Sequence, residues 1–157
     1  ISSSEHYAYF LYDSSGSFNL NYDKAKSWGI SCDADISFTQ KDLVNLNITY
    51  LRKELKSTSK YIPFIPSYQI AANYRRNWTD KFGTQFGIIG YSERYTDLLN
   101  ERKLSSFFNI NVYADYKFSN NFIIYAKINN LLNSNVFIWE NYKERDLFLA
   151  AGVFYKF

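Results

Sequence analysis

The chain has 157 residues, a formal net charge of +3 and an aromatic content of 20%, made up of 15 Tyr, 14 Phe and 3 Trp. Disordered chains are poor in aromatic and β-branched residues, so this composition excludes disorder, and the mild positive charge requires no nucleic-acid partner. The mean hydropathy is nonetheless −0.35, and the chain lacks the run of about 18 apolar residues that a transmembrane helix needs. A transmembrane β-strand needs only about 9–11 residues, so that possibility stays open.

Apolar and polar side chains alternate along most of the chain, which is the pattern of a β-strand with two unlike faces. In residues 27–39 the alternation is unbroken, with apolar side chains at the even positions. The strand expected over residues 5–12 has an ambiguous phase, and residues 98–105 show no helical stripe and are expected to form a loop. Eight strands are predicted in chain order, over residues 5–12, 27–39, 44–50, 67–75, 82–88, 106–118, 122–129 and 147–157.

The predicted connections alternate strictly between short and long. Three short polar turns are expected at residues 40–42, 79–81 and 119–121. Three long, charge-rich loops are expected at residues 53–65, 93–104 and 133–145. The apolar strand faces carry aromatic residues near both ends. Short turns at one end, long loops at the other and aromatic belts at both membrane interfaces are typical of transmembrane β-barrels.

A soluble β-sandwich or lipocalin-like barrel would show the same alternation, with the apolar face forming its core. In the membrane interpretation the apolar face lies against lipid, and the polar face lines an interior that readily accommodates Asp33, Asp35, Asn45 and Asn47. A Lys or Arg on the lipid face at the bilayer midplane would cost about 2–4 kcal/mol, and four of the predicted strands carry none there. The sequence therefore favours an all-β fold, namely a transmembrane antiparallel up-and-down β-barrel.

The end of the chain carries a motif with a known counterpart. Gly152, Tyr155 and Phe157 follow the pattern Gly-x-x-aromatic-x-Phe at the terminus. This resembles the outer-membrane β-signal that the barrel assembly machinery recognises. The signal usually has a polar residue two positions before the glycine, where this chain has Ala150. The resemblance implies that Gly152, Tyr155 and Phe157 act as an assembly signal.

A second motif precedes the first. Residues 125–133 read Tyr-Ala-Lys-Ile-Asn-Asn-Leu-Leu-Asn and are followed by Trp139 and Tyr142. This order resembles the last hairpin of TonB-dependent outer-membrane receptors, and the Asn-, Tyr- and Lys-rich composition looks most like the Bacteroidetes branch of that family. The likeness is good over residues 105–157 and looser over residues 28–95.

The resemblance implies that residues 1–157 are the C-terminal transmembrane segment of a barrel of roughly 22 strands. The plug domain, the TonB box and the earlier strands would then lie outside this chain. The chain begins with Ile1 rather than methionine, as expected for a processed chain or a fragment. A complete eight-stranded barrel is the structural alternative, and it requires residues 5–12 to pair with the strand that ends at Phe157.

Few residues on the polar face suggest chemistry. Asp33 and Asp35 lie two positions apart, but no His or Cys shares their face, so hydrogen bonding is expected in preference to catalysis. Cys32 on the apolar face is expected to be inert packing, and His6, the single histidine, does not predict a metal site. We therefore expect no enzyme activity, no metal and no other cofactor.

The long loops are the expected place for ligand contacts, because surface loops often carry function. The alternative is that their polar and aromatic residues are only solvated or interfacial. The candidate ligand-binding residues are Arg94, Tyr95, Arg102, Trp139 and Tyr142.

The resemblance implies a TonB-dependent transporter of the bacterial outer membrane that imports a scarce nutrient such as an iron chelate, a cofactor or a glycan. Its long loops would be extracellular and its short turns periplasmic. Expected partners are outer-membrane lipid, the barrel assembly machinery, the TonB complex through a region outside this chain, and a surface lipoprotein or other membrane-complex subunits. The alternatives are a structural barrel subunit of an outer-membrane secretion or assembly complex, and a small eight-stranded protein with adhesive or enzymatic loops.

Overall fold

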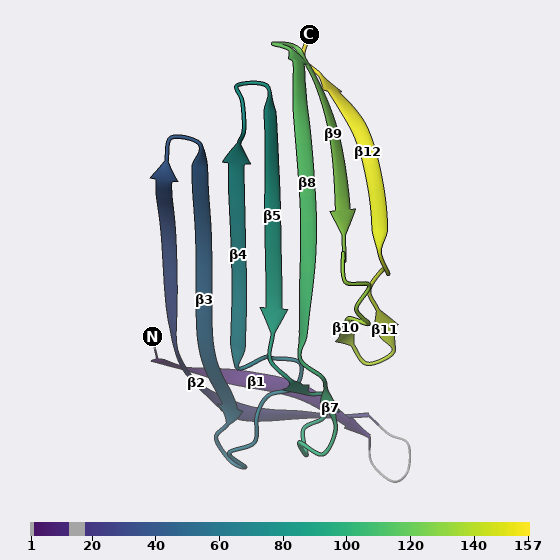
Figure 1. The fold of residues 1–157 in the computed structure, drawn as a ribbon. Coiled ribbons are helices and arrows are strands. Elements are labelled where there is room, and N and C mark those ends of the chain that lie inside the picture. Colours follow the sequence, from purple (N-terminus) through teal and green to yellow (C-terminus); the bar gives the residue numbers. More distant parts are fainter. Residues whose placement is uncertain (1, 13–17) are drawn as a thin grey trace.

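The computed structural model describes residues 2–12 and 18–157. Its main feature is one antiparallel sheet of eight strands that curves into a wall, with short turns at one end and long loops at the other (Figure 1). The strands lie side by side in chain order: β1 (Ser2–Tyr12), β2 (Phe18–Thr39), β3 (Asp42–Leu55), β4 (Tyr68–Asn77), β5 (Phe82–Tyr91), β8 (Phe107–Ser119), β9 (Phe122–Asn129) and β12 (Phe148–Tyr155). Among the described residues, none lies in a helix long and apolar enough to cross a membrane.

Two of the three long loops contain a small hairpin of their own. The strands β6 (Arg94–Tyr95) and β7 (Lys103–Leu104) pair within one loop, and β10 (Phe137–Trp139) and β11 (Tyr142–Lys143) pair within the next. Residues 98–105 were expected to form a loop throughout, but Lys103 and Leu104 form the strand β7. A strand of this length is too short to produce a periodic sequence pattern.

The sheet is open at both edges. In the described structure β1 pairs with β2 alone, and β12 pairs with β9 alone. A closed eight-stranded barrel, the alternative that the sequence allowed, would require residues 5–12 to pair with the strand ending at Phe157. That pairing is not formed, because β1 and β12 lie at opposite edges of the curved wall (Figure 1).

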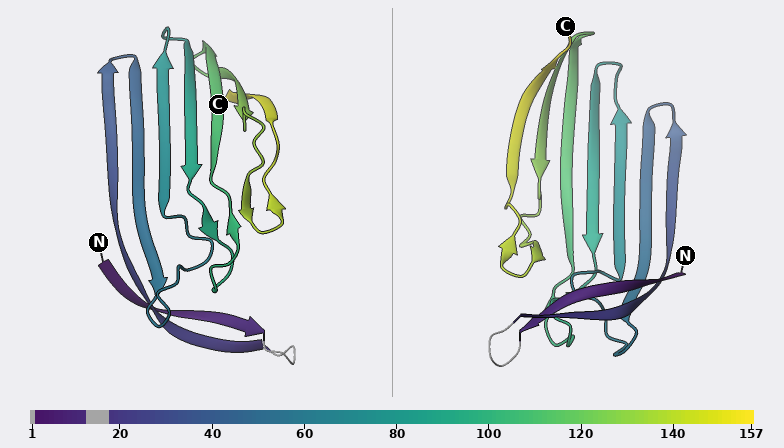
Figure 2. Two further views of the ribbon diagram at one scale, coloured as in Figure 1. Left: turned by 60° about the horizontal axis from the view of Figure 1, so that its bottom comes forward. Right: turned by 180° about the vertical axis from the view of Figure 1, so that it is seen from behind.

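The strand β2 begins earlier than predicted and reaches past its neighbours. Its first part, from Phe18 to Trp28, pairs with β1, and the part from Ala25 to Thr39 pairs with β3. As a result β1 and the beginning of β2 lie across the long-loop end of the wall, at a steep angle to the other strands (Figure 2). The sequence did not predict this extension. Lysines occupy positions 24 and 26, where the alternation of residues 27–39 would place apolar side chains.

The two faces of the wall differ as the alternation predicted. Apolar side chains on one face, termed the outer face, are exposed, including Ile30 (71%), Phe38 (69%) and Leu149 (65%). No second layer covers them within the described residues, so they do not form the core of a soluble sandwich. A contiguous exposed apolar face marks a membrane or protein contact. The opposite, inner face carries the polar side chains.

A hydrophobic cluster lies at the long-loop end, where β1 and β2 meet the loops. Ala25, Leu55 and Ile62 are buried, and further partly buried side chains pack against them. The packed side chains are Tyr7, Tyr9, Ile65 and Leu98. Burial of an aliphatic side chain stabilises by about 1.5–3 kcal/mol, so this cluster holds the β1–β2 pair against the loops.

The three short turns confirm the prediction and share one local cause. Each has a Ser or Thr at or shortly after the end of the preceding strand, and the hydroxyl oxygen of that residue accepts a hydrogen bond from the backbone N–H two residues later. Such contacts favour a turn over a continued strand. The pairs are Thr39 with Lys41 (3.1 Å), Thr79 with Lys81 (3.2 Å) and Ser119 with Asn121 (3.3 Å).

Candidate functional site

The three long loops form a connected layer at one end of the wall, termed the loop layer and comprising residues 56–67, 92–106 and 130–147. The first of these loops begins later than predicted, because β3 continues to Leu55. The loops are far apart in sequence, so the contacts between them are tertiary and could not be recognised from local patterns.

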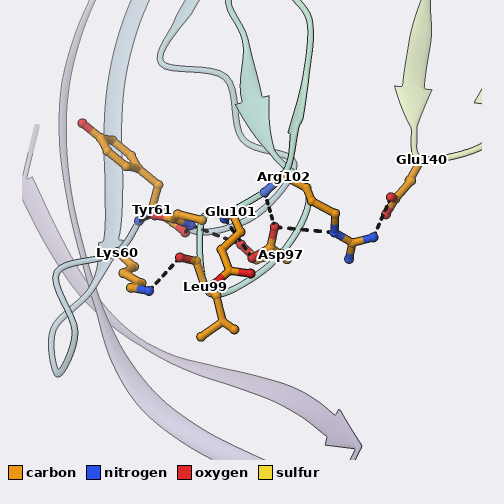
Figure 3. A network of polar contacts seen from close by, with 8 residues as sticks. Lys60, Tyr61, Asp97, Leu99, Glu101, Arg102 and Glu140 are labelled. Carbon is orange, nitrogen blue, oxygen red and sulfur yellow. Dashed lines mark hydrogen bonds and ion pairs between the residues drawn. The ribbon is translucent and has the colours of Figure 1, made fainter.

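Asn100 fastens the second loop to the first. Its side-chain Oδ1 accepts a hydrogen bond from the backbone N–H of Tyr61 at 2.7 Å, and its Nδ2 donates to the Tyr61 carbonyl at 2.9 Å. Asn100 has a φ of 58°, a conformation that Asn adopts more readily than most residues. Close by, Lys60 donates from Nζ to the carbonyl of Leu99 at 2.6 Å (Figure 3).

Asp97 orders the turn that positions Asn100. Its carboxylate accepts backbone N–H bonds from Arg102 at 2.7 Å and from Glu101 at 3.2 Å (Figure 3). Partial burial alone would raise the pKa of Asp97, but these N–H donors and the Arg102 guanidinium together hold the pKa below its ordinary value. The ionised carboxylate is therefore part of the folded loop.

Arg94, a predicted ligand contact, is buried and connects the second loop to the third. It is 4% exposed, and its Nη2 donates to the carbonyls of Phe137 and Ile138, the latter at 3.2 Å. The guanidinium also lies 5.5 Å from the centre of the Phe107 ring, and Nη1 has no hydrogen-bond partner in the described residues. Burial lowers the pKa of Arg94. The structure thus shows a loop-fastening role for Arg94.

Tyr95 lies on the wall of a cleft of about 260 Å³ between the first two loops. Its ring stacks on Tyr61 with 5.8 Å between centroids, and Lys103 Nζ lies 4.8 Å above it. Lys103 is also paired with Glu93, which raises the pKa of the lysine. Aromatic rings beside an ammonium group and hydroxyls can hold either a polar or a ring-shaped ligand.

The other three predicted residues lie toward the third loop. Arg102 is exposed and pairs with Glu140 at 2.9 Å, and the ring of Trp139 packs on Phe64 at 4.7 Å between centroids. Tyr142 is 73% exposed. The structure therefore brings Tyr95, Arg102 and Trp139 to contacts between loops, whereas Tyr142 extends into solvent.

Sequence reasoning missed Tyr61, Phe64 and Asn100, which complete these contacts. Their importance depends on partners that are distant in the chain, as with Tyr61 and Asn100, which are 39 positions apart. The one local signal is an Asn that follows two leucines in a polar loop, because Asn is favoured at positive φ.

The inner face of the wall carries a row of four aligned polar residues on neighbouring strands, with one glycine between them. The register places them directly opposite one another, in the order Asp35, Asn45, Asn73, Gly87 and Asn111. Asn45 donates to Asp35 at 2.5 Å.

The other carboxylate of the predicted pair, Asp33, accepts a bond from Asn47 at 2.5 Å. This matches the hydrogen-bonding interpretation for Asp33 and Asp35. Cys32 is exposed on the opposite face. Residues 2–12 and 18–157 hold no cluster of three or more His, Cys, Asp or Glu side chains arranged for a metal ion.

A sequence model of the TonB-dependent receptor-like β-barrel family matches residues 5–131, which is most of the chain. The chain belongs to this family. Members of the TonB-dependent receptor family are outer-membrane β-barrels, and the open sheet with one apolar face is a segment of such a barrel wall. The membrane interpretation and the resemblance found in the sequence are thereby confirmed.

Solved structures show the same fold. They include the copper transporter OprC (TM-score 0.82, 13% identity, 99% of this chain and 28% of that chain) and the siderophore receptor PirA from Acinetobacter baumannii (0.74, 16%, 98% and 26%). A third is FpvA from P. aeruginosa bound to heterologous pyoverdines (0.75, 12%, 97% and 24%). This TonB-dependent receptor segment spans about a quarter of the length of each of them. None of the curated protein sequences compared with it matches significantly.

Proposed function

We propose that this chain is the C-terminal barrel segment, residues 1–157, of an outer-membrane transporter that imports a scarce nutrient such as an iron chelate, a cofactor or a glycan. The observation that carries the proposal is the loop layer. Its three loops are fastened to one another by Asn100, Arg94 and Arg102, and the cleft beside Tyr61 and Tyr95 opens among them. A preorganised surface of this kind loses less entropy when it binds a ligand.

In this proposal the loop layer is extracellular and the short turns are periplasmic, as in other transmembrane barrels. The TonB complex supplies the energy for import and binds a region of the protein outside this chain. OprC is described as a copper transporter and PirA as a siderophore receptor, which supports a small cargo rather than a macromolecular one. The protein is a carrier and not an enzyme.

The barrel assembly machinery is the second proposed partner, through Gly152, Tyr155 and Phe157. Two contacts support this. The ring of Tyr125 lies on Gly152, so close that a Cβ there would be 2.6 Å from the Tyr125 hydroxyl oxygen. Tyr155 and Phe157 form an edge-to-face pair with 5.1 Å between ring centres. The terminal strand thus presents a compact aromatic end on the outer face.

A deletion strain tests the transport proposal. Cells that lack the whole gene are given labelled ferric chelates, cofactors and oligosaccharides, and uptake of one class is expected to fall to the level of a strain without TonB. Replacing Tyr61 and Tyr95 by Ala in the full-length receptor is expected to weaken uptake of that ligand about tenfold, given about 0.5–1.5 kcal/mol for an aromatic contact. Replacing Tyr116 on the outer face by Ala is the matched control.

Unchanged uptake of every ligand in the deletion strain would contradict transport. If the protein then co-purified stoichiometrically with other membrane proteins, the alternative of a structural subunit, with a surface lipoprotein or other complex members as partners, would replace it. Equal effects of the Tyr61/Tyr95 double substitution and of the Tyr116 substitution would leave transport intact but remove the cleft as the ligand site.

A further inference from the structure

The short-turn end of the inner face carries a row of cations that outnumber the carboxylates beside them. Lys41 and Lys81 lie in the first two short turns, and Arg75 and Lys117 lie on the strands beside them. Together these four residues are termed the basic rim, and they line one hollow of about 420 Å³. A water molecule accounts for about 30 Å³ of liquid, so the hollow has room for several side chains of a partner.

Backbone hydrogen bonds hold the rim in place. The carbonyl of Lys41 accepts from the N–H of Asn77 at 2.8 Å, and the carbonyl of Lys81 accepts from the N–H of Lys117 at 2.7 Å. Each turn is therefore fixed to the first strand of the next hairpin, β4 for Lys41 and β8 for Lys81. The turns form the upper edge of the wall in Figure 1, and these hydrogen bonds hold the lysine-bearing backbone against the neighbouring strands.

The floor of the hollow is a partly buried ion pair that crosses one strand. Arg75 on β4 reaches over β5 to Asp115 on β8, with 2.5 Å between Nη1 and Oδ1. It passes above Gly83, where a Cβ would lie 2.2 Å from Arg75 Nη2. Because Gly83 has no side chain, the Arg75 guanidinium fits above it. Asp115 is already paired with Arg75.

The remaining charges do not balance. The four cations of the rim share the hollow with two carboxylates, Asp80 and Asp115, which leaves an excess of two positive charges. Within the described residues no ion pair is formed by Lys41, Lys81 or Lys117. Unpaired ammonium groups gathered in a concave site attract anions.

The spacing of these lysines favours an extended partner. Lys41, in the turn just before β3, and Lys117 on β8 are separated by three strand spacings of about 4.8 Å, or roughly 14 Å. One inorganic phosphate cannot bridge that distance, whereas successive acidic side chains of a polypeptide can. Lipid is disfavoured because the hollow belongs to the inner face, and the apolar outer face is the one suited to hydrocarbon.

We propose that the basic rim is a docking surface for an acidic polypeptide segment that enters the barrel interior at the short-turn end. The carboxylates of that segment pair with Lys41, Lys81 and Lys117, while Arg75 and Asp115 keep the floor rigid. The proposal does not depend on the imported ligand or on transport itself.

Zero-length cross-linking tests it on the full-length receptor in its own outer membrane. A water-soluble carbodiimide joins an amine to a carboxylate only when the two are in ion-pair contact. We expect mass spectrometry to find peptides with Asp or Glu joined to the rim lysines, and slower acetylation of those lysines than of exposed Lys56 at the opposite end. The triple variant K41Q/K81Q/K117Q is expected to lose the cross-links, and the matched control K56Q to keep them.

Two outcomes would overturn the proposal. One is acetylation of the rim lysines as fast as that of Lys56, with no cross-linked acidic peptide. The other is protection that disappears when phospholipid is replaced by detergent, again with no cross-linked peptide, because lipid would then be the partner. Neither outcome bears on uptake, so this test can fail while the proposed transport function stands.

Discussion

The side chain of Asn100 pairs with both backbone groups of Tyr61, accepting from its N–H at 2.7 Å and donating to its carbonyl at 2.9 Å across 39 residues of sequence. The carboxamide thereby satisfies both backbone groups of one residue, as the backbone of a neighbouring strand does in a sheet. This contact joins two loops that otherwise share few backbone hydrogen bonds, so the loop layer depends on it.

Replacing Asn100 by Gly separates the contact from the backbone conformation. Glycine adopts a φ of 58° without strain but removes the three hydrogen bonds that the carboxamide makes to Tyr61 and Asp97. We expect a loss of about 1–3 kcal/mol in the local stability of the first two loops, because partly buried backbone groups lose their partners. Hydrogen exchange of residues 58–64 measures this loss. Asn135→Gly, at an exposed position of the third loop, is the control, and equal exchange in both variants would contradict the role of Asn100.

Asp97 makes the loop layer sensitive to acid. Because folding lowers its pKa, the ionised carboxylate stabilises the loop above the ordinary value of 3.8, and this contribution is lost as the pH falls through the lower folded-state pKa. We expect cleavage of residues 92–106 by pepsin to accelerate as the pH falls below 3.8. Asp97→Asn should be cleaved rapidly at every acid pH, whereas the neighbouring control Glu101→Gln should retain the wild-type profile. A wild-type profile in Asp97→Asn would show that the carboxylate is not responsible.

Gly152 is predicted to be required by the ring of Tyr125. A methyl group at position 152 would lie 2.6–3.0 Å from three atoms of that side chain. We expect Gly152→Ala to reduce the folded barrel in the outer membrane, at a cost of about 1–3 kcal/mol for overpacking. Heat-dependent gel mobility distinguishes folded from unfolded barrel. The double variant Gly152→Ala/Tyr125→Ala should recover folding, and if it does not, the glycine is needed directly by the assembly machinery.

The two faces of β2 are predicted to respond oppositely to the same charge. Cys32 lies on the outer face, and Ser31 on the inner face is bonded to Thr49 at 2.9 Å. Arginine in place of Cys32 should cost about 2–4 kcal/mol in a bilayer, because it faces hydrocarbon near mid-strand. Arginine in place of Ser31 faces the polar interior and should cost well under half of that. Denaturant unfolding in lipid vesicles measures both, and equal losses would reject the assignment of the faces.

The eight strands of the main sheet, their two faces and the short turns were predictable from the sequence, whereas the short hairpins within the loops were not. Alternation in residues 27–39 reports directly on which side chains face each way, and Thr39, Thr79 and Ser119 act on backbone atoms two residues away. Physical effects of such short range leave a local pattern. The extension of β2 to Phe18 was missed because lysines replace the apolar residues once the strand leaves the membrane region.

The candidate site was predictable only as a region. Arg94 was recognised as a loop residue, but its burial follows from the carbonyls of Phe137 and Ile138, which lie more than forty positions away. Tyr61 and Asn100 carried no local signal of their shared contact. Hydrogen bonds between distant loops depend on how the strands bring those loops together, and residue spacing alone does not determine that.

The sequence by itself determined which face of each strand lies against lipid and which faces the barrel interior. Side chains alternate between the two faces, and a charged side chain on the lipid face would destabilise the protein. What only the tertiary structure decided is which loops touch, where β1 lies and which charges are left unpaired. Arg75 forms an ion pair with Asp115 across Gly83. Among the described residues, no carboxylate forms an ion pair with Lys41, Lys81 or Lys117. Such pairings arise from strand register, which places residues forty positions apart within hydrogen-bond distance of one another.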